Sequence, residues 1–68
     1  MTRLRINGEE AEIAVGTIAE LLAERGIDPR ARFLAVAVNG AVVRRAEWPQ
    51  AALRPGDDVE IVRPFQGG

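Results

Sequence analysis

The last five residues, Pro-Phe-Gln-Gly-Gly at positions 64–68, hold the group with the clearest potential for chemistry. A terminal carboxylate is ionised at neutral pH and is a poor electrophile. It becomes reactive when a partner protein uses ATP to convert it into an acyl-adenylate, because a sulfur or nitrogen nucleophile can then displace AMP. We therefore expect the carboxylate of Gly68 to be the reacting group and this chain to be a protein substrate.

The residue types of this segment suit such a role. Gly67 and Gly68 lack a Cβ atom, so the backbone can pass through a narrow active-site channel and adopt dihedral angles closed to other residues. Pro64 cannot continue a β ladder and separates the segment from the strand before it. We predict one domain over residues 1–63 and a flexible tail over residues 64–68. Taken alone, the tail is also consistent with a frayed glycine-rich end.

Several residues beside the two glycines are candidates for partner binding. Phe65 would dock into a hydrophobic pocket of the partner, the alternative being that it folds back onto its own sheet. Arg63, Arg44 and Arg45 would meet acidic groups of an activating enzyme, although a solvated charged face is the better explanation, because isolated surface charges contribute little. The predicted partner-binding residues of the tail region are Arg63, Pro64, Phe65 and Gln66.

Missing residue types exclude most other chemistry. The chain has 68 residues with no Cys, His or Tyr, and all nine of its basic residues are arginines. A Ser-His or Cys-His nucleophile, a zinc site and Schiff-base chemistry are therefore excluded for the chain acting alone. We expect no catalytic residue, no metal site and no bound cofactor; ATP would be used by the partner.

Charge and hydrophobicity exclude further classes of partner. The net charge is −1, and the arginines are scattered rather than gathered in a stripe, so nucleic acid is not expected as a partner. No apolar run approaches the length of a membrane span, and the start of the chain lacks a signal-peptide hydrophobic region. A cytoplasmic location is the expectation.

Local patterns predict a strand hairpin followed by a helix. Leu4 and Ile6 alternate with arginines, Asn7-Gly8 is a hairpin-turn signal, and "EEAEIAV" at 9–15 alternates again. Thr17 and Glu20 have the spacing of a capping box, which predicts a helix beginning at Thr17. Gly26 is placed to end it as the left-handed residue of a Schellman motif.

The rest of the chain reads as three strands joined by turns. "FLAVAV" at 33–38 suits a central strand, Asn39-Gly40 repeats the hairpin signal, and "VEIVR" at 59–63 closes the domain. Trp48 would cap the core, and Trp48-Pro49 would open a single helical turn. Asp57 and Asp58 read as turn residues and not as a pair of catalytic carboxylates.

This order of elements predicts an α+β fold. Two hairpins and one helix with a single apolar stripe bury that stripe only against one face of one sheet. The order is that of the β-grasp, or ubiquitin-like, architecture: a mixed sheet of four to five strands packed on one main helix. In that architecture the last strand is internal to the sheet, so the tail leaves a rigid platform.

The whole chain resembles the ThiS family of sulfur carriers from thiamine biosynthesis. The resemblance lies in the early "NGE", in "VAVNGAVVRRAEW" and in the ending "PGDDVEIVRPFQGG". Arg44 stands where proline is common in similar sequences. The resemblance implies that a ThiF-type adenylyltransferase activates Gly68, that a cysteine desulfurase supplies persulfide sulfur, and that the resulting thiocarboxylate donates sulfur to a ThiG-type thiazole synthase.

Three alternatives remain open at the level of sequence. The small subunit of molybdopterin synthase shares the fold and the ending, but such chains are usually somewhat longer. A ubiquitin-type modifier would form isopeptide bonds on other proteins. A non-catalytic β-grasp binding module would tolerate changes at Gly67 and Gly68.

Overall fold

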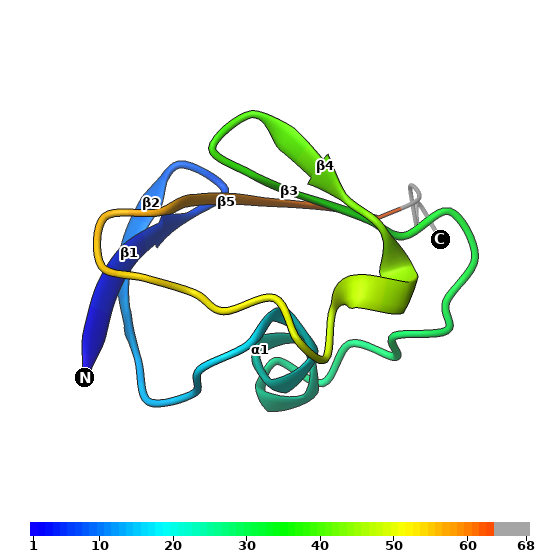
Figure 1. Ribbon diagram of the computed structural model, residues 1–68, viewed down its shortest axis with the longest axis horizontal. Helices are drawn as coiled ribbons and strands as arrows, with labels where there is room; N and C mark the ends of the chain where they lie inside the picture. Colours follow the sequence, from blue (N-terminus) through cyan, green and yellow to red (C-terminus); the bar gives the residue numbers. More distant parts are fainter. Residues whose placement is uncertain (64–68) are drawn as a thin grey trace.

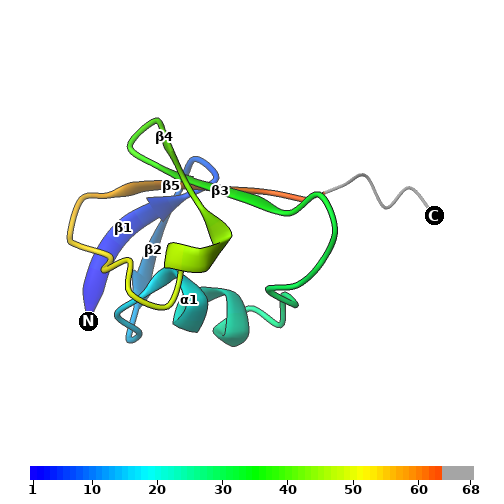
Figure 2. The ribbon, with the colours of Figure 1, turned by 45° about the vertical axis from the view of Figure 1, so that its right-hand side comes forward.

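A five-stranded sheet covers one side of a single α-helix in the computed structural model, which describes residues 1–63 (Figures 1 and 2). The strands follow the order β2-β1-β5-β3-β4; β1 and β5 run parallel, and the other neighbouring strands run antiparallel. The elements are β1 Thr2–Ile6, β2 Glu9–Ile13, α1 Ile18–Glu24, β3 Ala35–Val38, β4 Ala41–Val43, the 3-10 helix η1 Arg45–Glu47 and β5 Asp58–Val62. This is the expected α+β, β-grasp arrangement with a mixed sheet. Within the described part of the chain, no helix is both long and apolar enough to cross a membrane.

The first hairpin forms where the sequence predicts it. Asn7 and Gly8 both have positive φ, +52° and +84°, as a two-residue type I′ turn requires. The register runs from Ile6 opposite Glu9 to Thr2 opposite Ile13. The second strand was expected to continue to Val15 but ends at Ile13. In that register only Met1 precedes Thr2, so β1 offers no residue with which Val15 could pair.

Helix α1 begins and ends on the predicted signals. Thr17 Oγ1 accepts a hydrogen bond from the Glu20 backbone N–H (3.2 Å), and Glu20 Oε1 accepts one from the Thr17 N–H (3.2 Å), which completes the capping box. At the other end Gly26 has φ +72°, and the Ile27 N–H donates to the Leu22 carbonyl at 2.9 Å. These are the features of a Schellman motif, and they place Ile27 back against the core.

The segment before β3 differs from the sequence prediction. A strand was expected from Phe33 onward, but β3 begins only at Ala35. Phe33 has φ +62°, which is not a strand conformation, and Leu34 next to it is 5% exposed. The backbone therefore turns sharply before it enters the sheet.

The crossover to β5 also departs from the prediction. The short helical turn lies at Arg45–Glu47, before Trp48 and not after it. Trp48 itself is 2% exposed and its Nε1–H donates to the Val43 carbonyl at 2.9 Å. The expectation that Trp48 caps the core is thus confirmed, and its indole donor is satisfied as a buried donor should be.

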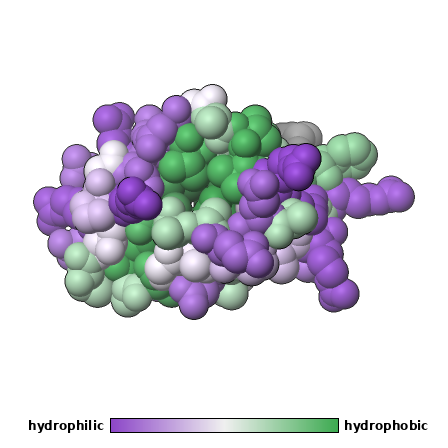
Figure 3. Space-filling model, in the orientation of Figure 1, coloured by the Kyte–Doolittle hydropathy of each residue, from purple (hydrophilic) through white to green (hydrophobic). Residues whose placement is uncertain are grey.

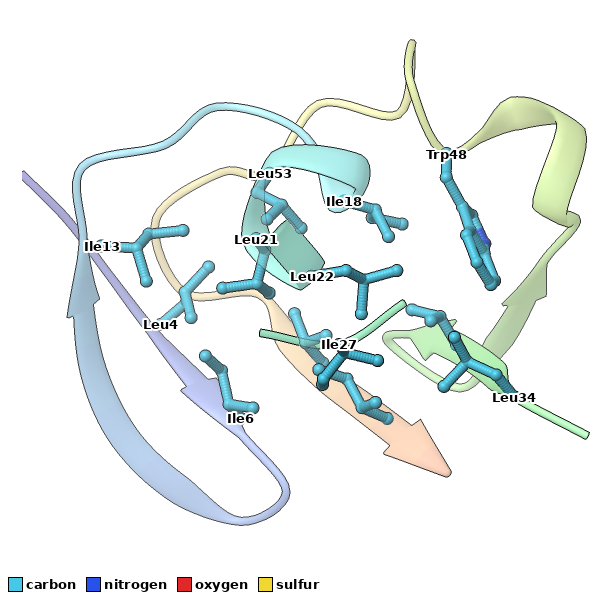
Figure 4. Close-up of a cluster of buried hydrophobic side chains, with 13 residues drawn as sticks. Leu4, Ile6, Ile13, Ile18, Leu21, Leu22, Ile27, Leu34, Trp48 and Leu53 are labelled. Carbon is cyan, nitrogen blue, oxygen red and sulfur yellow. The ribbon is translucent and has the colours of Figure 1, made fainter. Parts of the chain in front are cut away.

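The core lies between the sheet and α1 (Figure 4). Its side chains come from alternate positions of the strands, from the inner stripe of the helix and from the loops that cross below the sheet. Trp48 and Leu34 lie together at one end of the cluster in Figure 4. The buried residues are Leu4, Ile6, Ile13, Ile18, Leu21, Leu22, Ile27, Leu34, Val36, Trp48, Leu53, Val59 and Ile61.

Candidate functional site

The central strand β5 is the element that leads into the glycine tail. On one side it pairs with β3 from Val38 opposite Val59 to Ala35 opposite Val62. On the other side it pairs with β1 up to Ile6 opposite Val59. The backbone of β5 is therefore held by β3 as far as Val62, and by β1 only as far as Val59.

Asn7 extends this hold beyond the end of β1. Its backbone N–H donates to the Val59 carbonyl at 2.8 Å, and its side-chain Oδ1 accepts from the Ile61 N–H at 2.8 Å. Asn7, a turn residue, thus makes the hydrogen bonds to β5 that a neighbouring strand would otherwise make beyond the end of β1. The tail therefore follows a strand whose position is fixed.

Of the predicted site residues, only Arg63 lies within the described part of the chain. Its side chain is exposed and lines a surface hollow of about 120 Å³ together with Arg25, Asn7 and the isoleucines at 6, 27 and 61. Pro64, Phe65, Gln66, Gly67 and Gly68 lie outside the described residues. Their roles remain predictions.

The outer face of the sheet, turned away from α1, has a charged half over β1, β2 and the start of β5, and an apolar half over β3, β4 and the end of β5. On β1 and β2, Arg3 lies opposite Glu12, and their side chains form an ion pair at 3.2 Å. On β5 the outward residues are the exposed acids Asp58 and Glu60 and then Val62, which is 58% exposed. On β4, Val42 is 75% exposed. Figure 3, which views the sheet from its edge, shows a hydrophobic area in the upper middle of the molecule and hydrophilic side chains toward both ends. The apolar half includes the last residue of β5.

Arg45 was considered as a residue that meets acidic groups of a partner, but in the structure it makes contacts within its own chain. Its guanidinium donates hydrogen bonds to the backbone carbonyls of Pro29, Ala31 (3.0 Å) and Leu34 (3.3 Å). It also lies over the ring of Trp48, 4.9 Å from the centroid, as in a cation–π contact. Arg45 therefore clamps the 28–34 loop to η1 and to the core.

Arg44 lies on a solvated face and Asp57 lies in a turn, but Asp58, which was also predicted as a turn residue, is the first residue of β5. Arg44 is 81% exposed and lies 4.0 Å from Glu47 in a surface ion pair. Asp57 accepts hydrogen bonds from the Arg54 N–H and the Asn39 side chain, so it closes the turn before β5 as predicted. Among residues 1–63, no group of three or more acidic side chains is placed to hold a metal ion.

One end of the molecule brings together the 28–34 loop, η1 and the end of β5. The 28–34 loop and the end of β5 lie at the same end in Figures 1 and 2, and the hydrogen bonds of Arg45 bring η1 to that loop. We call residues 28–34, 44–47 and Arg63 the tail-side end. Sequence reasoning identified Arg63 there but missed Phe33, because the apolar run around it reads as a strand.

A small mixed sheet on one helix, with the last strand at its centre and leading into a Gly-Gly tail, defines a ubiquitin-like β-grasp domain. The family model described as the ThiS family matches residues 4–68. The chain belongs to the ThiS family.

Two curated proteins and two solved structures are similar to the chain. The thiazole synthase of Paramagnetospirillum magneticum is 39% identical over 67 residues, which are 97% of this chain but only 20% of that protein. The sulfur carrier protein ThiS of Thermus thermophilus is 36% identical over 63 residues, 93% of this chain and 95% of that one. The crystal structure of a thiamine biosynthesis protein (ThiS) from Geobacter metallireducens is 26% identical, with a TM-score of 0.78 over 98% of this chain and 100% of that chain. The solution structure of a thiamine biosynthesis protein from the same organism is 27% identical, with a TM-score of 0.78 over 98% of this chain and 88% of that one.

Proposed function

We propose that this protein is a sulfur carrier in thiamine biosynthesis and that Gly68 bears the sulfur as a thiocarboxylate. The observation that carries the proposal is the family match over residues 4–68, which includes both glycines of the tail. The Thermus relative that bears the name sulfur carrier protein aligns over nearly its whole length. The chain is then a co-substrate of other enzymes and not an enzyme itself.

The chemistry proceeds in balanced steps on the carboxyl group. A carboxylate oxygen of Gly68 attacks the α-phosphorus of ATP, and pyrophosphate leaves. A persulfide sulfur from a cysteine desulfurase then attacks the carbonyl carbon, and AMP leaves. A thiol reduces the resulting acyl disulfide to the thiocarboxylate, and the disulfide formed from that thiol is the oxidised product.

In this proposal the chain itself contributes a fixed position from which its tail can enter the active site of a partner enzyme. The fold holds β5 on both sides through Ala35 opposite Val62 and through Asn7, so the tail starts from a fixed point. A fixed start lowers the entropic cost of placing the terminal carbonyl in a partner's active site. The chemistry needs no side-chain catalyst from the carrier, which fits a sequence without Cys, His, Lys or Tyr.

Three enzymes are proposed as partners: a ThiF-type adenylyltransferase, a cysteine desulfurase and a thiazole synthase. Support for thiazole synthase comes from the Paramagnetospirillum protein of that name, a fifth of whose length aligns with nearly all of this chain. The adenylyltransferase and the desulfurase follow from the chemistry above. A cytoplasmic location is part of the same proposal, because adenylation consumes ATP.

Deletion of Gly68 tests the proposed attachment site. Wild-type protein incubated with ATP, a ThiF-type adenylyltransferase and a sulfur source should gain the mass of a sulfur-for-oxygen exchange, located on Gly68 by fragmentation. Fragmentation is needed because oxidation of Met1 adds nearly the same mass. The deletion variant should show no such gain while its melting temperature stays unchanged, because the core described in residues 1–63 runs from Leu4 to Ile61.

Two glycine substitutions make the test sharper. Gly67→Ala should slow loading, since a methyl group narrows access to the neighbouring carbonyl. Gly16→Ala is the matched control: a Cβ there would lie 3.7 Å from Glu20 Oε1, an ordinary contact, and far along the chain from the tail. Sulfur loading of the Gly68 deletion at the wild-type rate would refute the proposed site.

A further inference from the structure

Phe33 combines two properties that a surface residue seldom has together. Its φ of +62° lies in the left-handed region, where a bulky side chain is an outlier. Its side chain is 78% exposed, so burial within this chain does not compensate the strain. Strained residues of this kind persist where the surroundings impose the conformation, and they cluster at sites that bind ligands or partners.

The surroundings do impose the conformation of Phe33. On its C-terminal side, Leu34 is 5% exposed in the core, and on the N-terminal side Ile27 is 7% exposed. Between them, the Asp28 carboxylate accepts from the Arg30 N–H at 2.9 Å, and the Ala31 N–H donates to the Asp28 carbonyl at 3.0 Å. The 28–34 loop is thus pinned at both ends and folded into a turn.

The Arg45 clamp completes this support. It contacts carbonyls on both sides of Phe33, those of Ala31 and Leu34, and it is itself held over the Trp48 ring. One long-range side chain therefore holds a peptide unit on each side of the strained residue, the units that begin at Ala31 and at Leu34. The aromatic ring is presented on a rigid support, which lowers the entropic cost of burying it against another protein.

The charge around Phe33 indicates the kind of surface that it meets. The tail-side end carries five arginines, at positions 30, 32, 44, 45 and 63, against Asp28 and Glu47, a formal charge of +3, whereas the whole chain carries −1. The four arginines other than Arg45 do not belong to the clamp, and all four are exposed. An aromatic side chain within a basic rim complements an apolar pocket with acidic residues around it.

We propose that Phe33 is the aromatic anchor through which the tail-side end binds thiazole synthase, in an apolar pocket rimmed by Asp and Glu. This inference rests on the proposed function, because the same enzyme takes the tail that leaves β5 at this end. Thiazole synthase is chosen over the adenylyltransferase because a protein of that name aligns with 97% of this chain. Arg45 is a positioning residue that acts through Phe33.

Isothermal titration of the unloaded full chain against thiazole synthase of the source organism tests the anchor. Phe33→Ala should raise Kd about tenfold or more, as loss of a central aromatic contact does. Phe33→Gly should raise Kd to a similar extent while leaving the melting temperature unchanged or higher, because glycine adopts φ +62° without strain. Arg54→Ala, an exposed residue in the turn at the opposite end of β5, is the control and should leave Kd within about twofold of wild type.

The variant Arg45→Lys separates positioning from contact. It should raise Kd less than Phe33→Ala does and should speed amide exchange in residues 28–34, because lysine lacks the forked donors that reach several carbonyls. In the double variant with Phe33→Ala, Arg45→Lys should add little, since an absent ring cannot be positioned. Additive effects would show that Arg45 contacts the partner on its own.

The outcomes distinguish this inference from the proposed function. Sulfur loading of wild-type protein, followed by mass, tests the carrier role with no reference to Phe33. Unchanged Kd for both Phe33 variants, or no binding of the wild type to thiazole synthase, overturns the anchor. So does a result in which the Phe33 variants bind thiazole synthase normally but load sulfur slowly, because the anchor would then belong to the adenylyltransferase.

Discussion

Leu21 and Phe33 lie twelve residues apart, and these two large apolar side chains differ in their exposure to solvent. Leu21 on α1 is 0% exposed at the helix–sheet interface, whereas Phe33 is 78% exposed in a left-handed backbone conformation. Burial at the interface lowers the free energy of the folded state, and exposure at the tail-side end does not. We infer that stability resides mainly in the first region and partner recognition in the second.

The largest effect on stability is expected from Leu21→Ala. Loss of a fully buried leucine side chain and the cavity left behind should lower the free energy of unfolding by about 3 kcal/mol. Urea denaturation measures the change. Leu21→Met keeps the volume and should cost less than about 1.5 kcal/mol. A Leu21→Ala protein as stable as the wild type would mean that the helix–sheet interface is not where stability resides.

The same contrast explains which parts of the fold could be predicted. Both hairpins and both ends of α1 depend on signals within a few residues, such as Asn7-Gly8 and Thr17 with Glu20, and the structure confirms all of them. Alternation of apolar residues also places the inward faces of the strands correctly. Because these local signals fixed the type and order of the elements, few topologies were compatible with the sequence, and the β-grasp arrangement could be predicted.

The tail-side end was harder to predict because its conformation depends on distant residues. Arg45 reaches carbonyls 11 to 16 positions earlier in the chain, and no local pattern announces such contacts. Phe33 lies in an apolar run that favours a strand, but the clamp, the turn at Asp28 and the burial of Leu34 hold the backbone in another conformation. The predicted roles of Gly67 and Gly68 concern chemistry with partners, on which the packing of residues 1–63 gives no information.

Trp48 belongs to both regions, so Trp48→Phe tests how far they are separate. Phenylalanine keeps most of the buried ring but loses the Nε1–H bond to the Val43 carbonyl and weakens the contact with Arg45. We expect the free energy of unfolding to fall by about 1–2 kcal/mol. Because the Arg45 clamp loosens as well, Kd for thiazole synthase should also rise.

A control of similar cost in stability is needed to interpret the Trp48 result. Ile13→Val, at the far edge of the core on β2, removes one buried methyl group and should cost about 1 kcal/mol. It should leave Kd for thiazole synthase unchanged. If both variants weaken binding equally, lower stability alone explains the loss, and the clamp has no specific part in recognition.

The smallest effect is expected from Thr17→Ala, which removes the helix cap and changes nothing at the tail-side end. Glu20 loses the hydroxyl that accepts from its backbone N–H at 3.2 Å, although water can reach this exposed site. The free energy of unfolding should fall by about 1 kcal/mol, and Thr17→Ser, which keeps the acceptor, should recover most of it. Amide exchange should rise at the start of α1 but not in the 28–34 loop. Faster exchange in that loop, or a higher Kd for thiazole synthase, would show that the helix cap and the anchor are energetically coupled. The helix–sheet interface and the tail-side end would then not be separate in stability and recognition.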